Sequence, residues 1–173
     1  MCLTEELKER YRKFLEDLAQ KHSGELFSNG GKDHAIVLYQ VLLNHASGEV
    51  RIFCEEGISE IWQDKGVKKS LVDFISKDNS RVRILVENEN DEGFAELKDN
   101  DKVTVCHISS EGLNKIYTYF DNDNCNFAVF DSNMFRFEYD KQDYKAYGSF
   151  NDEEISNSMK ELFDEVWEQE GQR

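Results

Sequence analysis

The chain has 173 residues, of which 39% are hydrophobic, and it carries a formal net charge of −15 at pH 7. This length favours one domain that is large enough to bury a core without disulfide or metal staples. No apolar run approaches the roughly 18 residues of a membrane span, and the N-terminus shows no basic and then apolar signal segment. We therefore expect a cytoplasmic protein that makes no membrane contact.

The acidic charge balance bears on the partners of the protein. A surface that binds nucleic acid concentrates Lys and Arg on one face, where they neutralise phosphates. The basic residues of this chain form only two short runs, at 8–13 and 65–69, with acidic residues close by. We therefore expect no nucleic-acid partner. An acidic inhibitor that mimics DNA and occupies a nucleic-acid enzyme stays an alternative.

The four cysteines show no metal-binding pattern. Cys2, Cys54, Cys106 and Cys125 contain no Cys-x-x-Cys pair, and no ligand cluster has the spacing of a zinc site. A free thiol in an apolar strand behaves as a small hydrophobic side chain. We expect reduced cysteines, no metal and no cofactor.

Two helices are predicted in the first quarter of the chain. Residues 4–21 place apolar side chains on one helical stripe, with charged residues opposite. The run 34–46 is apolar nearly all round, which indicates a helix buried on most sides, and Asp33 is placed to cap its start. We treat residues 1–24 as an N-terminal amphipathic helix added to a domain that spans residues 30–170.

Strands and helices alternate in the middle of the chain. The expected elements are a strand at 49–54, a helix at 66–77, a strand at 81–87 and a strand at 102–108. Residues 55–65 and 88–101 are predicted to be connections, and the second contains a short helix near 94–97. Residues 109–123 are predicted to be irregular or weakly helical. This order is typical of an α/β layer with parallel strand pairs and right-handed crossovers.

The last third of the chain predicts a hairpin, a turn and a long helix. Strands are expected at 125–131 and 134–139, joined by Asp-Ser-Asn. A Gly-Ser-Phe-Asn turn follows at 148–151. The helix from about 152 to 169 carries a continuous apolar stripe, and its cap is the Asn or the Asp at its start.

The Gly-Ser-Phe-Asn turn and the elements before it resemble the catalytic core of the phospholipase D-like family, over about residues 30–168. The family signature is His-x-Lys, four further residues, Asp and, some residues later, Gly-Ser-x-Asn. The candidate site residues are therefore Asn126, Ala128, Asn133, Gly148, Ser149 and Asn151. The first three stand where the family has His, Lys and Asp, and the last three belong to Gly-Ser-x-Asn.

The resemblance implies a mixed, mostly parallel sheet flanked by helices on both faces, as a single phospholipase D-like half-domain. In active members two His-Lys-Asp sets meet in one site. One His attacks phosphorus, the other protonates the leaving group, and the Lys residues hold the phosphate charge. Short members complete this site as homodimers. Because Asn126 is no nucleophile and Ala128 carries no charge, the resemblance implies a member without catalytic residues.

We therefore expect a non-catalytic domain that acts by protein contact or as an accessory homodimer, and fold analogy suggests a bacterial stress or phage-defence system. The alternative is a diverged phosphodiesterase or nuclease that uses His34 or His107. His34 stands at a predicted helix start and His107 at a predicted strand end. Cys106 does not easily share a site with His107, because adjacent strand residues point to opposite faces.

Overall fold

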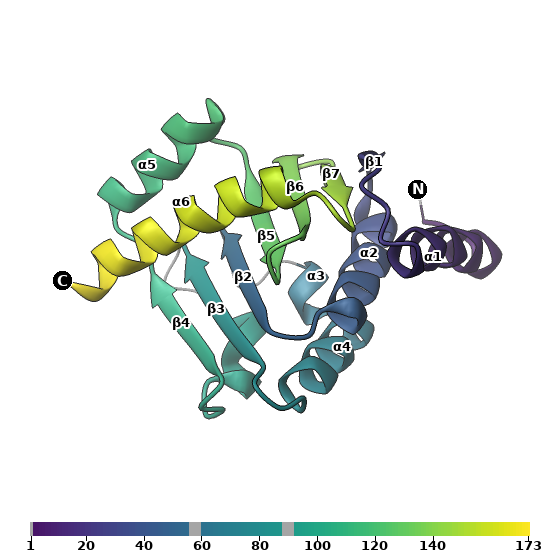
Figure 1. Cartoon of the computed structure of the whole chain (residues 1–173), viewed down its shortest axis with the longest axis horizontal. Helices are drawn as coiled ribbons and strands as arrows, with labels where there is room; N and C mark the ends of the chain where they lie inside the picture. The colour runs from purple at the N-terminus through teal and green to yellow at the C-terminus, as the bar shows by residue number, and fades with distance from the viewer. Residues whose placement is uncertain (1, 56–59, 88–91) are drawn as a thin grey trace.

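The computed structural model describes residues 2–55, 60–87 and 92–173. The chain folds into a seven-stranded mixed sheet with the order β1-β7-β6-β5-β2-β3-β4 (Figure 1). The strands are β1 Phe27–Asn29, β2 Glu49–Cys54, β3 Arg81–Val86, β4 Val103–His107, β5 Asn126–Phe130, β6 Met134–Asp140 and β7 Lys145–Ser149. The helices are α1 Glu5–Gln20, α2 Lys32–His45, α3 Glu60–Gln63, α4 Lys65–Ile75, α5 Ser110–Phe120, α6 Glu153–Gly171 and the short η1 Glu92–Leu97. The predicted α/β class is confirmed.

The two halves of the sheet run differently. β2, β3 and β4 are parallel, whereas β5 is antiparallel to β2, and β5, β6, β7 and β1 form antiparallel pairs. The predicted predominance of parallel pairs is not found, because only two of the six pairs are parallel. The reason is the short chain between the later strands. Three residues join β5 to β6 and four join β6 to β7, which is enough for a hairpin and too short for a crossover.

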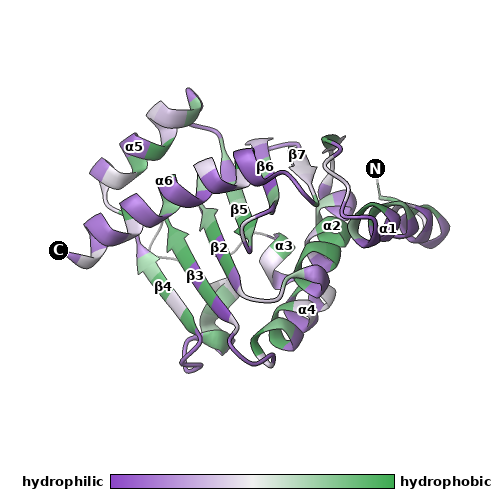
Figure 2. Cartoon of the chain, viewed as in Figure 1, coloured by the Kyte–Doolittle hydropathy of each residue, from purple (hydrophilic) through white to green (hydrophobic). Residues whose placement is uncertain are grey.

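Two layers of helices bury the sheet, as predicted. One face packs against α2, α3 and α4, with α1 docked on α2, and the other face packs against α5 and α6 (Figure 1). Alternation along the strands separates two cores, so that Ile52 of β2 lies in the first and Phe53 in the second. Hydrophobic residues accordingly follow the strands and the inner sides of the helices (Figure 2).

The first two helices lie close to their predicted limits. Thr4 caps α1 by accepting a hydrogen bond from the backbone N–H of Leu7 at 3.3 Å. The cap of α2 is Gly31 and not the predicted Asp33. Gly31 has a φ of 89°, which glycine adopts without steric cost. Asp33 lies in the first turn instead, where its carboxylate accepts a hydrogen bond from the backbone N–H of Leu3 at 2.6 Å.

Three elements differ from the sequence pattern. The segment predicted as irregular or weakly helical contains the regular helix α5, which Ser109 caps by accepting a hydrogen bond from the Gly112 N–H at 3.1 Å. β1 is not predicted, and β7 has no predicted range. They are three and five residues long, too short for an alternating pattern to stand out. They form because they pair with each other and because β7 pairs with β6.

The terminal helix is confirmed, with Asp152 as its cap. Its carboxylate accepts a hydrogen bond from the backbone N–H of Ile155 at 3.0 Å. No helix in the described part of the chain is both long enough and apolar enough to cross a bilayer.

The two predicted connections are only partly described. Residues 56–59 of the first and 88–91 of the second lie outside the described residues. The described remainder contains α3 in the first connection and η1 in the second. η1 covers the short helix predicted near 94–97.

Candidate functional site

The Gly-Ser-Phe-Asn turn at the end of β7 is held by close packing. A Cβ atom on Gly148 would come within 3.0 Å of the Phe27 ring of β1. The Phe150 ring stacks on Phe27 with centroids 5.6 Å apart. Ser149 is fully buried, and its hydroxyl accepts a hydrogen bond from the backbone N–H of Asn151 at 3.3 Å. The turn therefore joins β1 to β7 as a packing element.

Two of the predicted site residues meet beside this turn. Asn133 Nδ2 donates a hydrogen bond to Asn151 Oδ1 at 3.3 Å. The backbone N–H of Asp152 donates to the carbonyl oxygen of Asn133 at 2.8 Å. The link between β5 and β6 is thus fixed to the start of α6.

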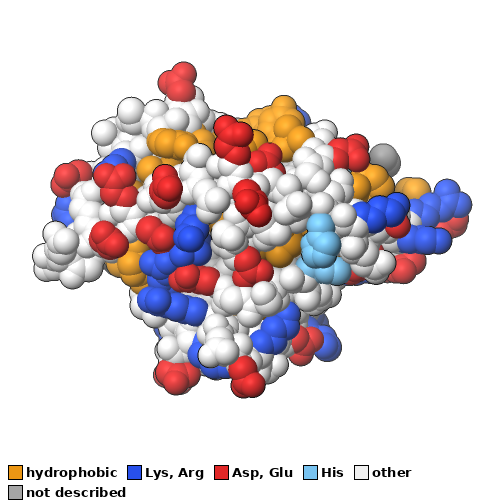
Figure 3. Space-filling view, in the orientation of Figure 1, with side chains coloured by type: hydrophobic (Ala, Val, Ile, Leu, Met, Phe, Trp, Pro, Cys, Tyr) orange, Lys and Arg blue, Asp and Glu red, His pale blue; other side chains and the backbone are white. Residues whose placement is uncertain are grey.

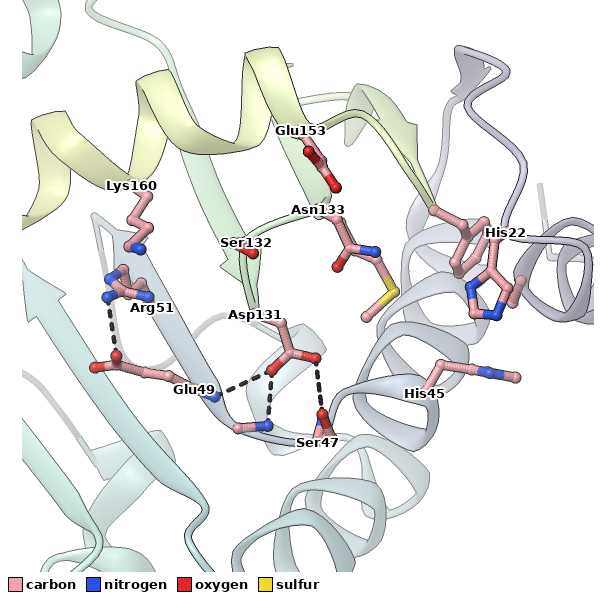
Figure 4. Close-up of a pocket in the computed structure, with 14 residues that line it drawn as sticks. His22, His45, Ser47, Glu49, Arg51, Asp131, Ser132, Asn133, Glu153 and Lys160 are labelled. Carbon is pink, nitrogen blue, oxygen red and sulfur yellow. Dashed lines mark hydrogen bonds and ion pairs between the residues drawn. The ribbon is translucent and has the colours of Figure 1, made fainter.

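Asp131 fixes the same link to the connection between α2 and β2. It has a φ of 57°, a left-handed conformation that Asp tolerates better than most residues. Its carboxylate accepts hydrogen bonds from the backbone N–H groups of Ser47 at 3.0 Å, Gly48 at 2.7 Å and Glu49 at 3.1 Å (Figure 4). Three segments that are distant in sequence are therefore held at one place.

A cleft of about 630 Å³ opens between these segments. Two histidines from elsewhere line it, His22 after α1 and His45 at the end of α2, together with Lys160 of α6 (Figure 4). His45 Nε2 lies 2.6 Å from a carboxylate oxygen of Glu16, so one ring nitrogen is already engaged. Lys160 forms no ion pair with any described residue.

The cleft differs from the site that the family chemistry requires. The turn and the β5–β6 link line it with Phe150, Asn133 and Met134, and none of these is a nucleophile or a cation. Within the described ranges, no hydrogen bond joins either cleft histidine to this turn, and no three His, Cys, Asp or Glu side chains gather as metal ligands would.

The structure does not bring Asn126 and Ala128 to the Gly-Ser-Phe-Asn turn. Both residues lie on β5, and β6 runs between β5 and β7. Asn126 pairs with Glu138 at the end of β5 that is remote from the cleft. Ala128 is fully buried between neighbouring strands.

His34 and His107 also lie outside the cleft. His34 stands in the first turn of α2, where its Nδ1 is 2.8 Å from the carbonyl oxygen of Gly30 and its ring meets the Tyr11 ring edge-on. His107 ends β4, the strand at the opposite edge of the sheet from β1. The two predicted alternative histidines therefore do not share a site.

A second cavity, of about 270 Å³, lies at the carboxyl end of β2. Arg136 and Glu138 of β6 line it, although they are only 1% and 4% exposed. A guanidinium nitrogen of Arg136 lies 3.0 Å from Oε1 of Glu138. Burial acts to lower the pKa of Arg136, but the Glu138 carboxylate and Tyr39 outweigh burial and raise it. Arg136 therefore remains charged inside the protein.

Asn126 positions the carboxylate of this buried ion pair. Its Nδ2 donates a hydrogen bond to Glu138 Oε2 at 2.8 Å, and its Oδ1 accepts one from the backbone N–H of Glu55 at 3.0 Å. Burial raises the pKa of Tyr39, which packs over the Arg136 guanidinium, to about 12. Asn126 thus belongs to the second cavity and not to the cleft.

The residues missed by the sequence analysis are Arg136, Glu138, His22 and His45. A signal for Arg136 exists, because Met134-x-Arg136-x4-Lys141 has the intervals of His-x-Lys-x4-Asp. β6 also pairs directly with β7, with Arg136 opposite Gly148. If the signature is aligned in this way, Arg136 stands at its Lys position, and Met134 stands at its His position and supplies no imidazole. No local pattern could predict that His22 and His45 line one cleft, because this depends on how α1 docks on α2.

Comparisons with known proteins establish the fold. No family model matches the chain, and no curated protein is similar to it in sequence. TrmBL2, an archaeal chromatin protein with a novel mode of DNA binding, matches 95% of the chain at a TM-score of 0.58 and 14% identity. NucT from Helicobacter pylori matches 83% of the chain at a TM-score of 0.57 and 12% identity.

The share of each matched structure that the chain covers is different. It spans 62% of the TrmBL2 chain and 97% of the NucT chain. Similarity at these identities concerns the fold alone. The chain therefore shares its α/β fold with these two structures.

Proposed function

We propose that this protein is a non-catalytic domain of the phospholipase D-like fold that acts by protein contact. The observation that carries the proposal is the make-up of the cleft beside the Gly-Ser-Phe-Asn turn. The side chains that the turn and the β5–β6 link contribute to it, Asn133, Met134 and Phe150, include no nucleophile and no cation, whereas phosphodiester chemistry of the family type needs an imidazole nucleophile and a phosphate-holding cation. The imidazoles and the Lys160 amine of the cleft come from other elements, and among the described residues no hydrogen bond joins either imidazole to the turn.

An apolar groove supplies a surface for such contact. The groove measures about 300 Å³ and lies where β6 and β7 meet α5 and α6. Four of its side chains are 39% to 52% exposed, namely Leu26, Tyr119, Tyr147 and Ile155. Exposed apolar clusters of this kind are typical of protein interfaces. Figure 3 shows hydrophobic side chains gathered near β6 and β7, while acidic and basic side chains are interspersed over much of the same view.

The partner that we propose for this groove is a second copy of the chain. A twofold dimer uses the same patch on both subunits, so the exposed apolar side chains of one copy meet the apolar groove of the other, and this contact brings few charges together although the protein is strongly acidic. β5 is an interior strand, paired on both sides. The dimer contact therefore uses the groove and not the edge of β5.

Sedimentation velocity over a dilution series tests this proposal. We expect the unchanged protein to dimerise and the double variant Tyr147→Ser, Ile155→Ser to be monomeric. Val72→Ser is the matched control, because Val72 is 49% exposed on α4, outside the groove. A protein that stays monomeric at every concentration, or a double variant that dimerises as well as the control, contradicts a dimer through this groove.

A diverged phosphodiesterase is the second candidate, and the two cleft histidines favour it. His22 and His45 line the same cleft as the Gly-Ser-Phe-Asn turn. Hydrolysis of bis(p-nitrophenyl) phosphate or plasmid DNA, with and without divalent metal, distinguishes the candidates. Turnover that is lost in both His22→Ala and His45→Ala, but kept in His34→Ala, supports the enzyme and overturns the non-catalytic proposal.

A further inference from the structure

We propose that the second cavity binds a small, planar, uncharged molecule that presents an amide edge, an N–H group beside a C=O group. The cavity is separate from the apolar groove and from the cleft, so this inference does not depend on the proposed dimer. It rests on the buried ion pair of Arg136 and Glu138, on two unmade hydrogen bonds and on the balance of charge around the cavity.

The ion pair is the first observation. Buried ion pairs contribute little net stability compared with apolar residues of the same size. The pair nevertheless occupies two inward positions of β6 beside Tyr39. Buried charged groups that line a cavity are candidates for ligand binding.

Two polar atoms of this pair lack hydrogen bonds. Arg136 Nε and Glu138 Oε1 are buried and make no hydrogen bond with any described residue, although Oε1 is the oxygen that lies 3.0 Å from the guanidinium Nη2 in the ion pair. The first is a donor and the second an acceptor. The other oxygen of Glu138 is already engaged by Asn126. A ligand with a C=O group for Arg136 and an N–H group for Glu138 would satisfy both atoms at once.

The charges around the cavity favour an uncharged ligand. Among the described residues, three carboxylates line it, and each has a cation within ion-pair distance. Glu138 pairs with Arg136 at 3.0 Å, Glu55 with Lys141 at 2.7 Å and Glu60 with Lys32 at 3.0 Å. A phosphate or an ammonium ion would have to displace one partner of such a pair, whereas a neutral amide leaves all three pairs intact.

The walls favour a flat molecule. Tyr39, Trp62 and Tyr144 line the cavity, and the ring centroids of Tyr39 and Trp62 lie 4.7 Å apart. Aromatic walls bind planar rings by stacking. A single water could satisfy the two polar atoms, but it would leave most of the 270 Å³ and the aromatic wall without a partner.

The place in the fold agrees with a ligand site. Cys54 and Glu55 at the carboxyl end of β2 line the cavity. β2 is also the strand at which the parallel half of the sheet meets the antiparallel half. In open α/β sheets, ligands bind in the crevice outside the carboxyl ends of the strands.

The test uses uracil as the probe and Trp62 as the reporter. The chain has two tryptophans, and Trp167 stacks on Phe163 outside the cavity. In the variant Trp167→Phe, fluorescence therefore reports on Trp62 alone. We expect uracil to change this fluorescence in a saturable way. 1,3-Dimethyluracil, which has the same ring without N–H groups, should bind about tenfold more weakly, since the Glu138 acceptor stays unpaired.

Protein variants complete the test. Glu138→Gln in the Trp167→Phe background should weaken uracil binding about tenfold. Asn126→Ala removes the hydrogen bond that positions the Glu138 carboxylate, and it should weaken binding as well. Lys160→Met in the cleft is the control and should bind uracil normally. The proposal is overturned by no saturable response to uracil, by equal binding of the dimethyl compound, or by competition from inorganic phosphate.

Discussion

Asp131 and Gly48 are 83 positions apart in the chain, yet Oδ1 of Asp131 accepts a hydrogen bond from the backbone N–H of Gly48 at 2.7 Å. The same carboxylate accepts from Ser47 and Glu49. One side chain after β5 therefore holds the start of β2, and this fixes the shape of the cleft between them.

The contacts of Asp131 predict a loss of stability in Asp131→Asn. Asn tolerates the left-handed conformation and keeps one oxygen, which can accept from Gly48 and Glu49 but not from Ser47 as well. We expect a loss of about 1 kcal/mol in the free energy of unfolding, because one backbone donor loses its partner and the other two lose a charged acceptor. Urea unfolding measures it, with the exposed Asp78→Asn as control. Equal stability of the two variants would show that the contact is dispensable.

The packing of Gly148 predicts a cost for Gly148→Ala. The added methyl group would lie 3.0 Å from both the Phe27 ring and a backbone oxygen, so the chain must shift, and overpacking of this kind costs about 1–3 kcal/mol. Gly171→Ala is the matched control, since nothing lies within 4 Å of its Cβ position. Partial recovery in the double variant Gly148→Ala, Phe27→Leu would identify the ring as the obstacle. A Gly148→Ala protein as stable as the control would argue against close packing at the turn.

Asp164 predicts a pH dependence of stability. Burial acts to raise the pKa of this carboxyl, but hydrogen bonds and charge from Arg51 and Arg83 outweigh burial and lower it. The folded protein therefore holds the charged form more strongly than the unfolded chain does. The stabilisation is fully present above the unfolded pKa of about 4 and is lost as pH falls through the lower folded pKa.

The comparison of unchanged protein with Asp164→Asn measures this contribution. The two free energies of unfolding should differ most at neutral pH and should converge below pH 4 or so. Asp73→Asn serves as control, because Asp73 only pairs with Lys69 on the surface of α4. A gap that stays constant with pH would mean that the carboxylate charge is not the source of the stability.

The cysteines predict unequal thiol reactivity. Burial raises the pKa of Cys125 to about 12 and raises that of Cys54 and Cys106, so their reactive thiolate forms are scarce at neutral pH. Cys2 is exposed. We expect a thiol reagent to titrate one cysteine rapidly in the native protein and all four in urea. Cys2→Ser should abolish the rapid phase, and a rapid phase that survives this change would place a reactive thiol elsewhere.

Local pattern was sufficient for much of the fold. The stripes of α1 and α6 and the alternation in β2 and β3 predicted these elements close to their limits, because a helix or strand that buries one face repeats its apolar residues at a fixed spacing. The cap of α6 at Asp152 was likewise predictable from its residue type and place.

The sites, in contrast, depend on tertiary contacts. The residues before the Gly-Ser-Phe-Asn turn were enough to show that it has no His-x-Lys before it, and the order of the elements was enough for the α/β class. The strand pairing showed that β6 and not β5 lies beside the turn and that Asn126 orients a buried Glu138, whereas the docking of α1 on α2 brings His22 and His45 to one cleft. The reason is physical: spacing along the chain sets which face a side chain takes, whereas the neighbours of that face depend on pairings between segments tens of residues apart.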